Sequence, residues 1–139
     1  MPGHRCLLDT MYVIDLLSSR EMEPLAEAIS SGRFEAIVSV VSITEILNVL
    51  GRKDEALLKG VLDRLLSSEF LLADTTYAIA HRAGILKLRQ GIPTADALIA
   101  ATGIQYGASH LLTDDSHFSA VKGLIKPVNL KQLMAMVRQ

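Results

Sequence analysis

The stretch that decides the fold lies at residues 110–118 and reads HLLTDDSHF. A short apolar run ends abruptly there in two neighbouring carboxylates, Asp114 and Asp115. Adjacent acids at the exit of a buried strand destabilise a fold, because their charges repel and burial penalises each ionised group. A divalent cation is a common compensating partner for such a pair. The pattern therefore raises the question of whether other acids stand at equivalent places elsewhere in the chain.

Length and composition indicate one domain with a large aliphatic core. The 139 residues predict a single domain over residues 1–139. Half of the residues are apolar but only 4% are aromatic, so the core must be built from Leu, Ile, Val and Ala. The net charge of −1 gives no global basic field, which leaves nucleic-acid binding to a local patch.

The compartment is indicated by the N-terminal region and the single cysteine. Cys6 excludes an internal disulfide and lies in an apolar run, so we expect a buried, unreactive thiol. Asp9 interrupts the first apolar stretch, which argues against a signal peptide. No apolar run approaches the roughly 18 residues of a membrane span. We therefore expect a cytoplasmic protein without a membrane partner.

Hydrophobic periodicity predicts strands that alternate with helices. Apolar and β-branched runs predict strands at 6–8, 34–41, 70–73, 109–112 and 125–128, the last at an edge because it contains a proline. Helical spacing predicts helices at 12–17, 25–31, 42–50, 57–66, 77–88, 97–106 and 130–137. Two of these helices begin with capping-box pairs, Ser42 with Glu45 and Asn129 with Gln132. The alternation predicts an α/β domain on a central, mainly parallel sheet of four to five strands.

Acidic residues recur at the carboxyl ends of these strands. Asp9 follows the first strand, and Asp114 and Asp115 follow the fourth. Glu45 and Asp96 lie in the first turns of two helices. Because strand ends and the following helix starts share one edge of a parallel sheet, these acids are expected to converge. An all-oxygen site of this kind suits Mg²⁺ or Mn²⁺.

Each acid also has a purely structural interpretation. Asp9 can end a strand, Glu45 can complete a capping box, and Asp96 can favour the positive end of a helix dipole. Asp114 and Asp115 can cap a short helix. Capping does not require all of them to share one edge, however, so their joint placement favours a metal site.

Three side chains beside the acids have open roles. The hydroxyls of Thr10 and Thr113 can orient a carboxylate or a bound water, or bond the backbone at a strand end. His117 is predicted to lie at the rim of the site without acting in catalysis, and Phe118 to anchor the loop in the core. Basic residues that could hold phosphates lie in or just after two helices, although solvated helix faces are the simpler explanation for them: Arg52 and Lys53 after one, and Arg82, Lys87 and Arg89 at the other.

Four segments resemble the acidic motifs of PIN-domain nucleases. They are residues 8–10 (LDT), 42–45 (SITE), 94–102 (TADALIAAT) and 112–118 (LTDDSHF). Their order and spacing match over nearly the whole chain, and the compact length is most similar to the VapC-type ribonuclease toxins of prokaryotic toxin–antitoxin pairs. The resemblance implies a three-layer α/β/α PIN-like fold and hydrolysis of RNA phosphodiester bonds with Mg²⁺ or Mn²⁺.

The resemblance also implies site residues and partners. Asp9, Glu45, Asp96 and Asp115 take the metal-binding and catalytic places, with Thr113 beside them. Asp114 falls at the variable place of the last motif, and Thr10 and Asp114 are auxiliary candidates. Met11 is a departure, since the family often has Asn or another small polar residue there. An antitoxin protein and a second copy of the chain are the implied partners.

Two other functions remain open at the level of the sequence. A phosphoacceptor signalling domain also gathers acids and Mg²⁺ at a strand edge, but it requires a lysine after a later strand, for which only Lys122 and Lys126 are available. A PIN-like module that has lost its chemistry and only binds is the second alternative. Acids at all four motif positions argue against it.

Overall fold

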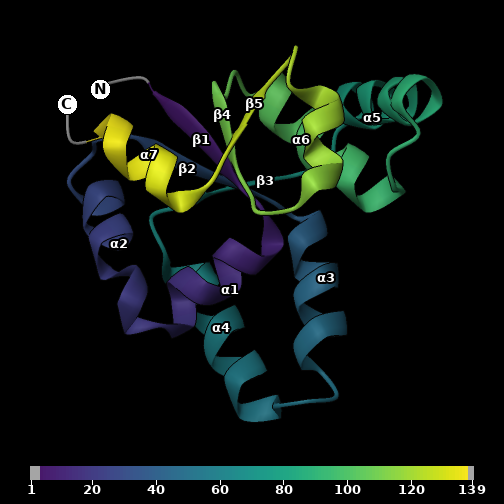
Figure 1. The fold of residues 1–139 in the computed structure, drawn as a ribbon. Helices are drawn as coiled ribbons and strands as arrows, with labels where there is room; N and C mark the ends of the chain where they lie inside the picture. Colours follow the sequence, from purple (N-terminus) through teal and green to yellow (C-terminus); the bar gives the residue numbers. More distant parts are fainter. Residues whose placement is uncertain (1–3, 138–139) are drawn as a thin grey trace.

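The computed structural model describes residues 4–137 and places the strands in one parallel sheet (Figure 1). Within this range the sheet has five strands in the order β3-β2-β1-β4-β5. Neighbouring strands pair in parallel throughout. The strands are β1 (Arg5–Leu8), β2 (Glu35–Ser39), β3 (Leu71–Ala73), β4 (His110–Leu112) and β5 (Lys126–Val128). The predicted parallel sheet and the edge position of the proline-containing strand are both confirmed.

The predicted helices are all present, with ends that differ by a few residues. They are α1 (Thr10–Ser18), α2 (Glu23–Ser30), α3 (Val41–Leu50), α4 (Glu55–Ser67), α5 (Tyr77–Gln90), α6 (Thr94–Gln105) and α7 (Leu130–Val137). There are also two short 3₁₀ helices, η1 (Arg20–Met22), which was not predicted, and η2 (Ser116–Val121), which is the short helix that the two acids after the fourth strand were expected to cap. Across residues 4–137, no helix is both long and apolar enough to cross a membrane.

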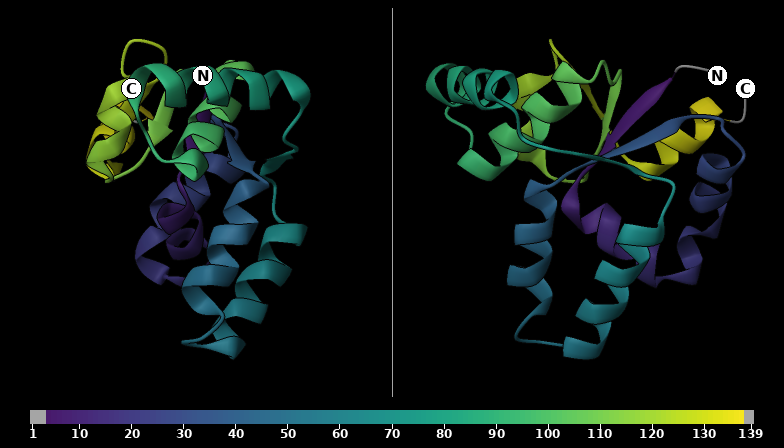
Figure 2. Two further views of the ribbon diagram at one scale, coloured as in Figure 1. Left: turned by 90° about the vertical axis from the view of Figure 1, so that its right-hand side faces the viewer. Right: turned by 180° about the vertical axis from the view of Figure 1, so that it is seen from behind.

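Alternation along the strands creates two cores, one on each face of the sheet. On β1, Cys6 and Leu8 face one core, which includes residues of α1, α2, α3, α4 and α7. Leu7 faces the other core, with residues of α5, α6 and η2. Figure 2 shows these helices on opposite sides of the strands. This is the expected three-layer α/β/α arrangement, and full burial raises the pKa of the Cys6 thiol to about 12, as expected for an unreactive cysteine.

Helix α6 is the central helix of the second layer. Its residues Ala97 and Ile99–Thr102 are all buried. A Cβ atom at Gly103 would lie 2.7 Å from Ile125 Cδ1 and 3.1 Å from Leu7 Cβ, so glycine permits the helix to lie close against the sheet. The first turn of this buried helix carries Asp96.

Helices α3 and α4 lie side by side and project from one end of the sheet (Figures 1 and 2). The apolar side chains of α3 differ in their exposure. Ile46 and Leu50 are buried, but the side chain of Leu47 is 46% exposed. One apolar position of α3 therefore faces solvent.

The start of α3 corrects the predicted end of the second strand. We expected the strand to run to Val41, but β2 ends at Ser39 and Val41 opens the helix. The Ser39 hydroxyl accepts a hydrogen bond of 3.1 Å from the Val41 N–H. This bond turns the chain and so ends the strand, although the next two residues, Val40 and Val41, are β-branched.

Candidate metal centre

The acids lie near the carboxyl end of the central strand β1, from which the later strands extend the sheet toward both edges. Strand β1 is flanked by β2 on one side and β4 on the other. Asp9 follows β1, and Thr113 to Asp115 follow β4. The Asp9 N–H donates to the Leu112 carbonyl oxygen at 3.0 Å, which ties the two strand ends together. Open α/β sheets bind ligands at such a point, outside the carboxyl ends of the strands.

Asp9 is both a helix cap and a member of the acidic group. Its Oδ1 accepts the Thr10 N–H at 2.8 Å and so caps α1. Its Oδ2 accepts the Thr113 hydroxyl at 2.7 Å. Burial raises the pKa of Asp9, the two hydrogen bonds oppose this rise, and the charges of Asp115 and Asp114 add to it. The Thr113 hydroxyl thus fixes the direction of the Asp9 carboxylate.

Glu45 is held by a second threonine. The Thr10 hydroxyl donates to Glu45 Oε1 and lies 2.9 Å from Ser42 Oγ. Helix α3 has Val40 as its N-cap without a side-chain capping bond, so the predicted capping box of Ser42 and Glu45 is wrong. The physical reason is that the hydroxyl of Thr10, on α1, binds both side chains and turns them toward the site.

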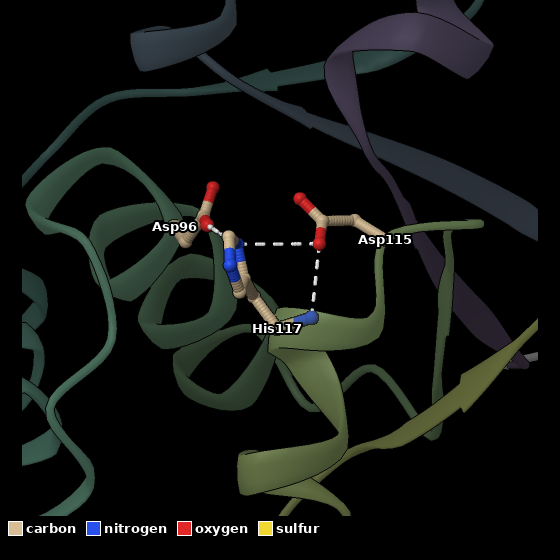
Figure 3. Close-up of side chains that lie close together, drawn as sticks. All are labelled: Asp96, Asp115 and His117. Carbon is tan, nitrogen blue, oxygen red and sulfur yellow. Dashed lines mark hydrogen bonds and ion pairs between the residues drawn. The ribbon is translucent and has the colours of Figure 1, made fainter.

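Asp96, Asp115 and His117 form the most compact group (Figure 3). The Nδ1 atom of His117 lies 3.5 Å from Asp96 Oδ2 and 3.3 Å from Asp115 Oδ1. Among the described residues, one ligand atom from each of these three side chains lies within 4.8 Å of the other two. Asp9 and Glu45 stand outside this compact group but act on it through their charges.

The charges on the carboxylates of the site act on one another. Burial raises the pKa of Asp96, and the negative charges of Asp115, Asp9 and Glu45 raise it further. His117 is the neighbour that lowers it. The four predicted acids therefore do converge at one edge of the sheet, and their mutual repulsion favours a bound cation there. Their individual roles in binding or catalysis stay predictions.

The backbone after β4 fixes the place of Asp115. Its N–H donates to the Thr113 hydroxyl at 2.9 Å, and its Oδ1 accepts the His117 N–H at 2.9 Å. Asp115 thereby caps η2, as the sequence suggested for one of the two acids. Phe118 is fully buried and anchors the loop, as predicted.

Asp114 is directed to a different partner. The Tyr12 hydroxyl donates to Asp114 Oδ1 at 2.7 Å and accepts the Leu130 N–H at 3.2 Å. Burial, together with the bond to Asp114, raises the pKa of Tyr12 to about 12. The two adjacent acids of the opening stretch therefore separate, because Asp114 joins α1 to the start of α7 while Asp115 joins the acidic group.

The sequence did not reveal the contact of Ser42 with Thr10 or that of Tyr12 with Asp114. Nor did it reveal that His117 lies close to both Asp96 and Asp115. The spacing of Ser42 and Glu45 carried a signal, since residues three apart share one face of a helix. That signal was assigned to a capping box. Tyr12 and Asp114 are 102 residues apart, and no local pattern connects them.

The donor set fits a hard divalent cation. Carboxylate oxygens are the ligands that Mg²⁺ and Mn²⁺ prefer. A hollow of about 280 Å³ is lined by Thr113 to Ser116 and extends toward β5 and the start of α7, so that Asp115 is its one member among the four predicted acids. A larger hollow of about 500 Å³ lies over α5, lined by residues such as Tyr77, His81 and Arg82, and contains none of the acids. Of these two hollows, only the smaller one is therefore lined by a predicted site acid.

A family comparison matches this arrangement. The family model described as the PIN domain matches residues 6–124. The chain belongs to the PIN-domain family. All four acidic segments of this PIN domain fall within the matched range.

Solved structures share the fold at low sequence identity. The protein PAE2754 from Pyrobaculum aerophilum matches with a TM-score of 0.72 at 16% identity, over 97% of each chain. VapBC2 from Rickettsia felis, bound to a promoter DNA fragment, gives 0.68 at 20% identity, over 90% of this chain and 98% of that one. VapC20 from Mycobacterium tuberculosis, described as a Sarcin–Ricin loop cleaving toxin, gives 0.68 at 16% identity, over 87% and 97%. A search of curated proteins yields no match.

Proposed function

We propose that this PIN domain is a Mg²⁺- or Mn²⁺-dependent endoribonuclease and the toxin of a toxin–antitoxin pair. The observation that carries the proposal is the convergence of Asp9, Glu45, Asp96 and Asp115 at one edge of the sheet. Capping alone does not explain the convergence, because the Glu45 carboxylate caps no helix and Asp96 gains charged neighbours that raise its pKa.

Some side chains of the site bind the cation, and others orient the carboxylates. Asp96 and Asp115 present oxygens to a cation, and Asp9 and Glu45 complete the negative field around it. Thr113 and Thr10 keep the latter two carboxylates in one orientation. A divalent ion bound by such carboxylates acidifies the attacking water and stabilises charge that develops on the phosphate.

Features of the surface support an RNA substrate. The polar hollow beside Asp115 has room for part of a nucleotide. The last turn of α5 carries the exposed residues Lys87 and Arg89, and the chain then leads directly into the first turn of α6, which holds Asp96. Cationic side chains beside an acidic centre give affinity for the phosphate backbone without specifying a sequence.

The similar structures and one helix surface support protein partners. A structure from Klebsiella pneumoniae with a TM-score of 0.64 and 24% identity is described as a toxin–antitoxin complex, and VapBC-5 from Mycobacterium tuberculosis, with a TM-score of 0.61 and 19% identity, is described as a member of the VapBC family of toxin–antitoxin systems. In this chain, Leu47 exposes an apolar side chain on the projecting α3. We propose an antitoxin and a second copy of the chain as partners, in a cytoplasmic setting.

Cleavage of a labelled RNA tests the proposal. We expect the purified chain to cut RNA with Mg²⁺ or Mn²⁺ and to stop when EDTA removes the ion. Asp9→Asn and Asp96→Asn should keep the fold and lose cleavage. Asp63→Asn is the matched control, because Asp63 is an exposed acid paired with Lys59 outside the site. Equal cleavage by wild type and the two site variants would overturn the proposal.

The geometry argues against Lys126, one of the two lysines that a phosphoacceptor domain could use. A phosphoacceptor domain needs a lysine close to the acids, but Lys126 pairs with His110 at the amino end of β5, at the opposite edge of the sheet. Labelling with a small phosphodonor would detect such an activity. A binding module without chemistry would be indicated by the absence of Mg²⁺ and Mn²⁺ binding in calorimetry.

A further inference from the structure

We propose that His117 supplies a nitrogen ligand to the cation held by Asp96 and Asp115, and that this ligand makes the site favour Mn²⁺ over Mg²⁺. The inference rests on the proposed function in one respect, that a divalent cation binds at the acidic edge. It goes beyond the four acids because it adds an imidazole to the ligand set. It also predicts which of the two candidate ions binds more tightly.

The two distances from the imidazole are close to the spacing of neighbouring ligands around one ion. His117 Nδ1 lies 3.3 Å from Asp115 Oδ1 and 3.5 Å from Asp96 Oδ2. Two ligands at right angles around an octahedral ion with bonds of about 2.1 Å lie about 3.0 Å apart. Movements of a few tenths of an ångström therefore bring the imidazole into the ion's coordination shell. Figure 3 shows the ring between the two carboxylates, which come from α6 and from the loop after β4.

The backbone places the imidazole there. The His117 N–H donates to Asp115 Oδ1 at 2.9 Å, so the residue is tied to the carboxylate that its own ring approaches. The next residue, Phe118, is fully buried and fixes the chain on the other side. The His117 side chain is nevertheless 60% exposed, so an ion from solvent can reach it. The position is held by the fold and remains open to a ligand.

The chemistry of the added ligand sets the preference between ions. Mg²⁺ takes oxygen ligands and loses its waters reluctantly. Mn²⁺ shares with Mg²⁺ the preference for carboxylate oxygens, but as a first-row transition ion it accepts an imidazole nitrogen more readily than Mg²⁺ does. A site with two carboxylates and one imidazole is therefore expected to hold Mn²⁺ more tightly than a site with carboxylates alone. The affinity for Mg²⁺ should depend little on the imidazole.

A competing role predicts the opposite result. If His117 acts only as a positive counter-charge between Asp96 and Asp115, a bound ion has to displace it. Removing the ring would then leave the affinity for Mn²⁺ unchanged or raise it. The sign of the change in Mn²⁺ affinity therefore separates a ligand from a counter-charge.

Metal binding by His117→Ala decides between the two roles. We expect calorimetry to show Mn²⁺ affinity about tenfold lower in the variant, with Mg²⁺ affinity changed less than about twofold. Pulsed electron paramagnetic resonance of bound Mn²⁺ should show coupling to a directly bound ¹⁴N nucleus in wild type and lose it in the variant. His81→Ala is the matched control, since His81 is an exposed histidine on α5 stacked on Tyr77. It should keep both the affinity and the coupling.

The outcomes distinguish this inference from the proposed function. Unchanged or tighter Mn²⁺ binding in His117→Ala, or no nitrogen coupling in wild type, overturns the inference even where RNA is cleaved. Nitrogen coupling in a protein that cleaves no RNA supports the inference and contradicts the proposed nuclease. Circular dichroism of His117→Ala verifies that the fold is intact. If the variant unfolds, the nitrogen coupling of wild type alone supports or overturns the ligand role.

Discussion

The two halves of the acidic site are built on different principles. Asp9 and Glu45 receive hydrogen bonds from hydroxyl groups, those of Thr113 and Thr10. In the other half, Asp96 and Asp115 approach each other around His117. The first half is oriented by neutral donors supplied by the fold. The second concentrates negative charge around a single imidazole.

This difference shows where the fold alone is sufficient and where an external partner is required. Hydroxyl donors stabilise a buried carboxylate by direct hydrogen bonding, with no need for a counter-charge. Asp96 has no such donor among the hydrogen bonds of the described residues, and three like charges raise its pKa. A cation is therefore expected to stabilise mainly the second half, while the first half stays in place without it.

The largest expected effect separates the two adjacent acids of the last motif. Asp115→Asn should reduce RNA cleavage by roughly a hundredfold or more, because it removes a charged oxygen from the compact group. Asparagine still caps η2, so the fold should be kept. Asp114→Asn should change cleavage less than about threefold, because its amide oxygen can still accept the Tyr12 hydroxyl. Initial rates with Mn²⁺ measure both. An equal loss of cleavage in the two variants would contradict the different roles of Asp114 and Asp115.

A smaller effect is expected where a neutral donor links the halves. The Thr113 hydroxyl donates to Asp9 and accepts the Asp115 N–H. Thr113→Val should lower cleavage by about tenfold, since the shape is kept while both bonds are lost. Thr113→Ser, which retains the hydroxyl, should recover most of the rate. A valine variant as active as wild type would show that the orientation of Asp9 is unimportant.

The raised pKa values predict how the metal-free protein responds to pH. Burial and like charges raise the pKa of Asp9 and Asp96 above the ordinary value of 3.8, so the folded state binds more protons than the unfolded state above that pH. The free energy of unfolding that these groups contribute is then fully present below 3.8 and falls as the pH rises through their folded pKa values. Urea unfolding in EDTA measures this fall. In Asp96→Asn, the free energy of unfolding should fall less as the pH rises. A fall as large as that of wild type would contradict the charge repulsion.

The smallest effect is expected outside the acidic group. Tyr12→Phe removes the hydroxyl that joins Asp114 to the start of α7. The free energy of unfolding should fall by about 1 kcal/mol, the usual value of such bonds. Cleavage should change less than about twofold, because the compact group is untouched. A large loss of cleavage at unchanged stability would place Tyr12 within the functional site.

The sequence predicted the fold well because the signals that define it are local. Apolar runs and helical periodicity located each strand and helix to within a few residues. The Asn129–Gln132 capping box is confirmed by reciprocal bonds of 2.9 Å and 2.8 Å. The edge position of β5 followed from Pro127, which cannot donate to a second neighbour. The convergence of the acids followed from the parallel sheet alone.

The details of the site depend on contacts between distant segments. The pair Ser42 and Glu45 satisfied a capping pattern, but Thr10 competes for both side chains across 32 and 35 residues. The choice between Asp114 and Asp115 required the position of the Tyr12 hydroxyl. His117 was placed correctly at the rim, yet its approach to Asp96 depends on how η2 packs beside α6. Such contacts have no signature in a single sequence.

The melting temperature of Asp96→Asn with and without Mn²⁺ tests the central claim most directly. In EDTA, the variant should melt above wild type, because one of several repelling charges is gone. In saturating Mn²⁺, the order should reverse, because wild type gains the free energy of ion binding and the variant gains little. Asp63→Asn should follow wild type in both conditions. A variant that melts below wild type in EDTA, or gains as much from Mn²⁺, would contradict a cation site built on Asp96.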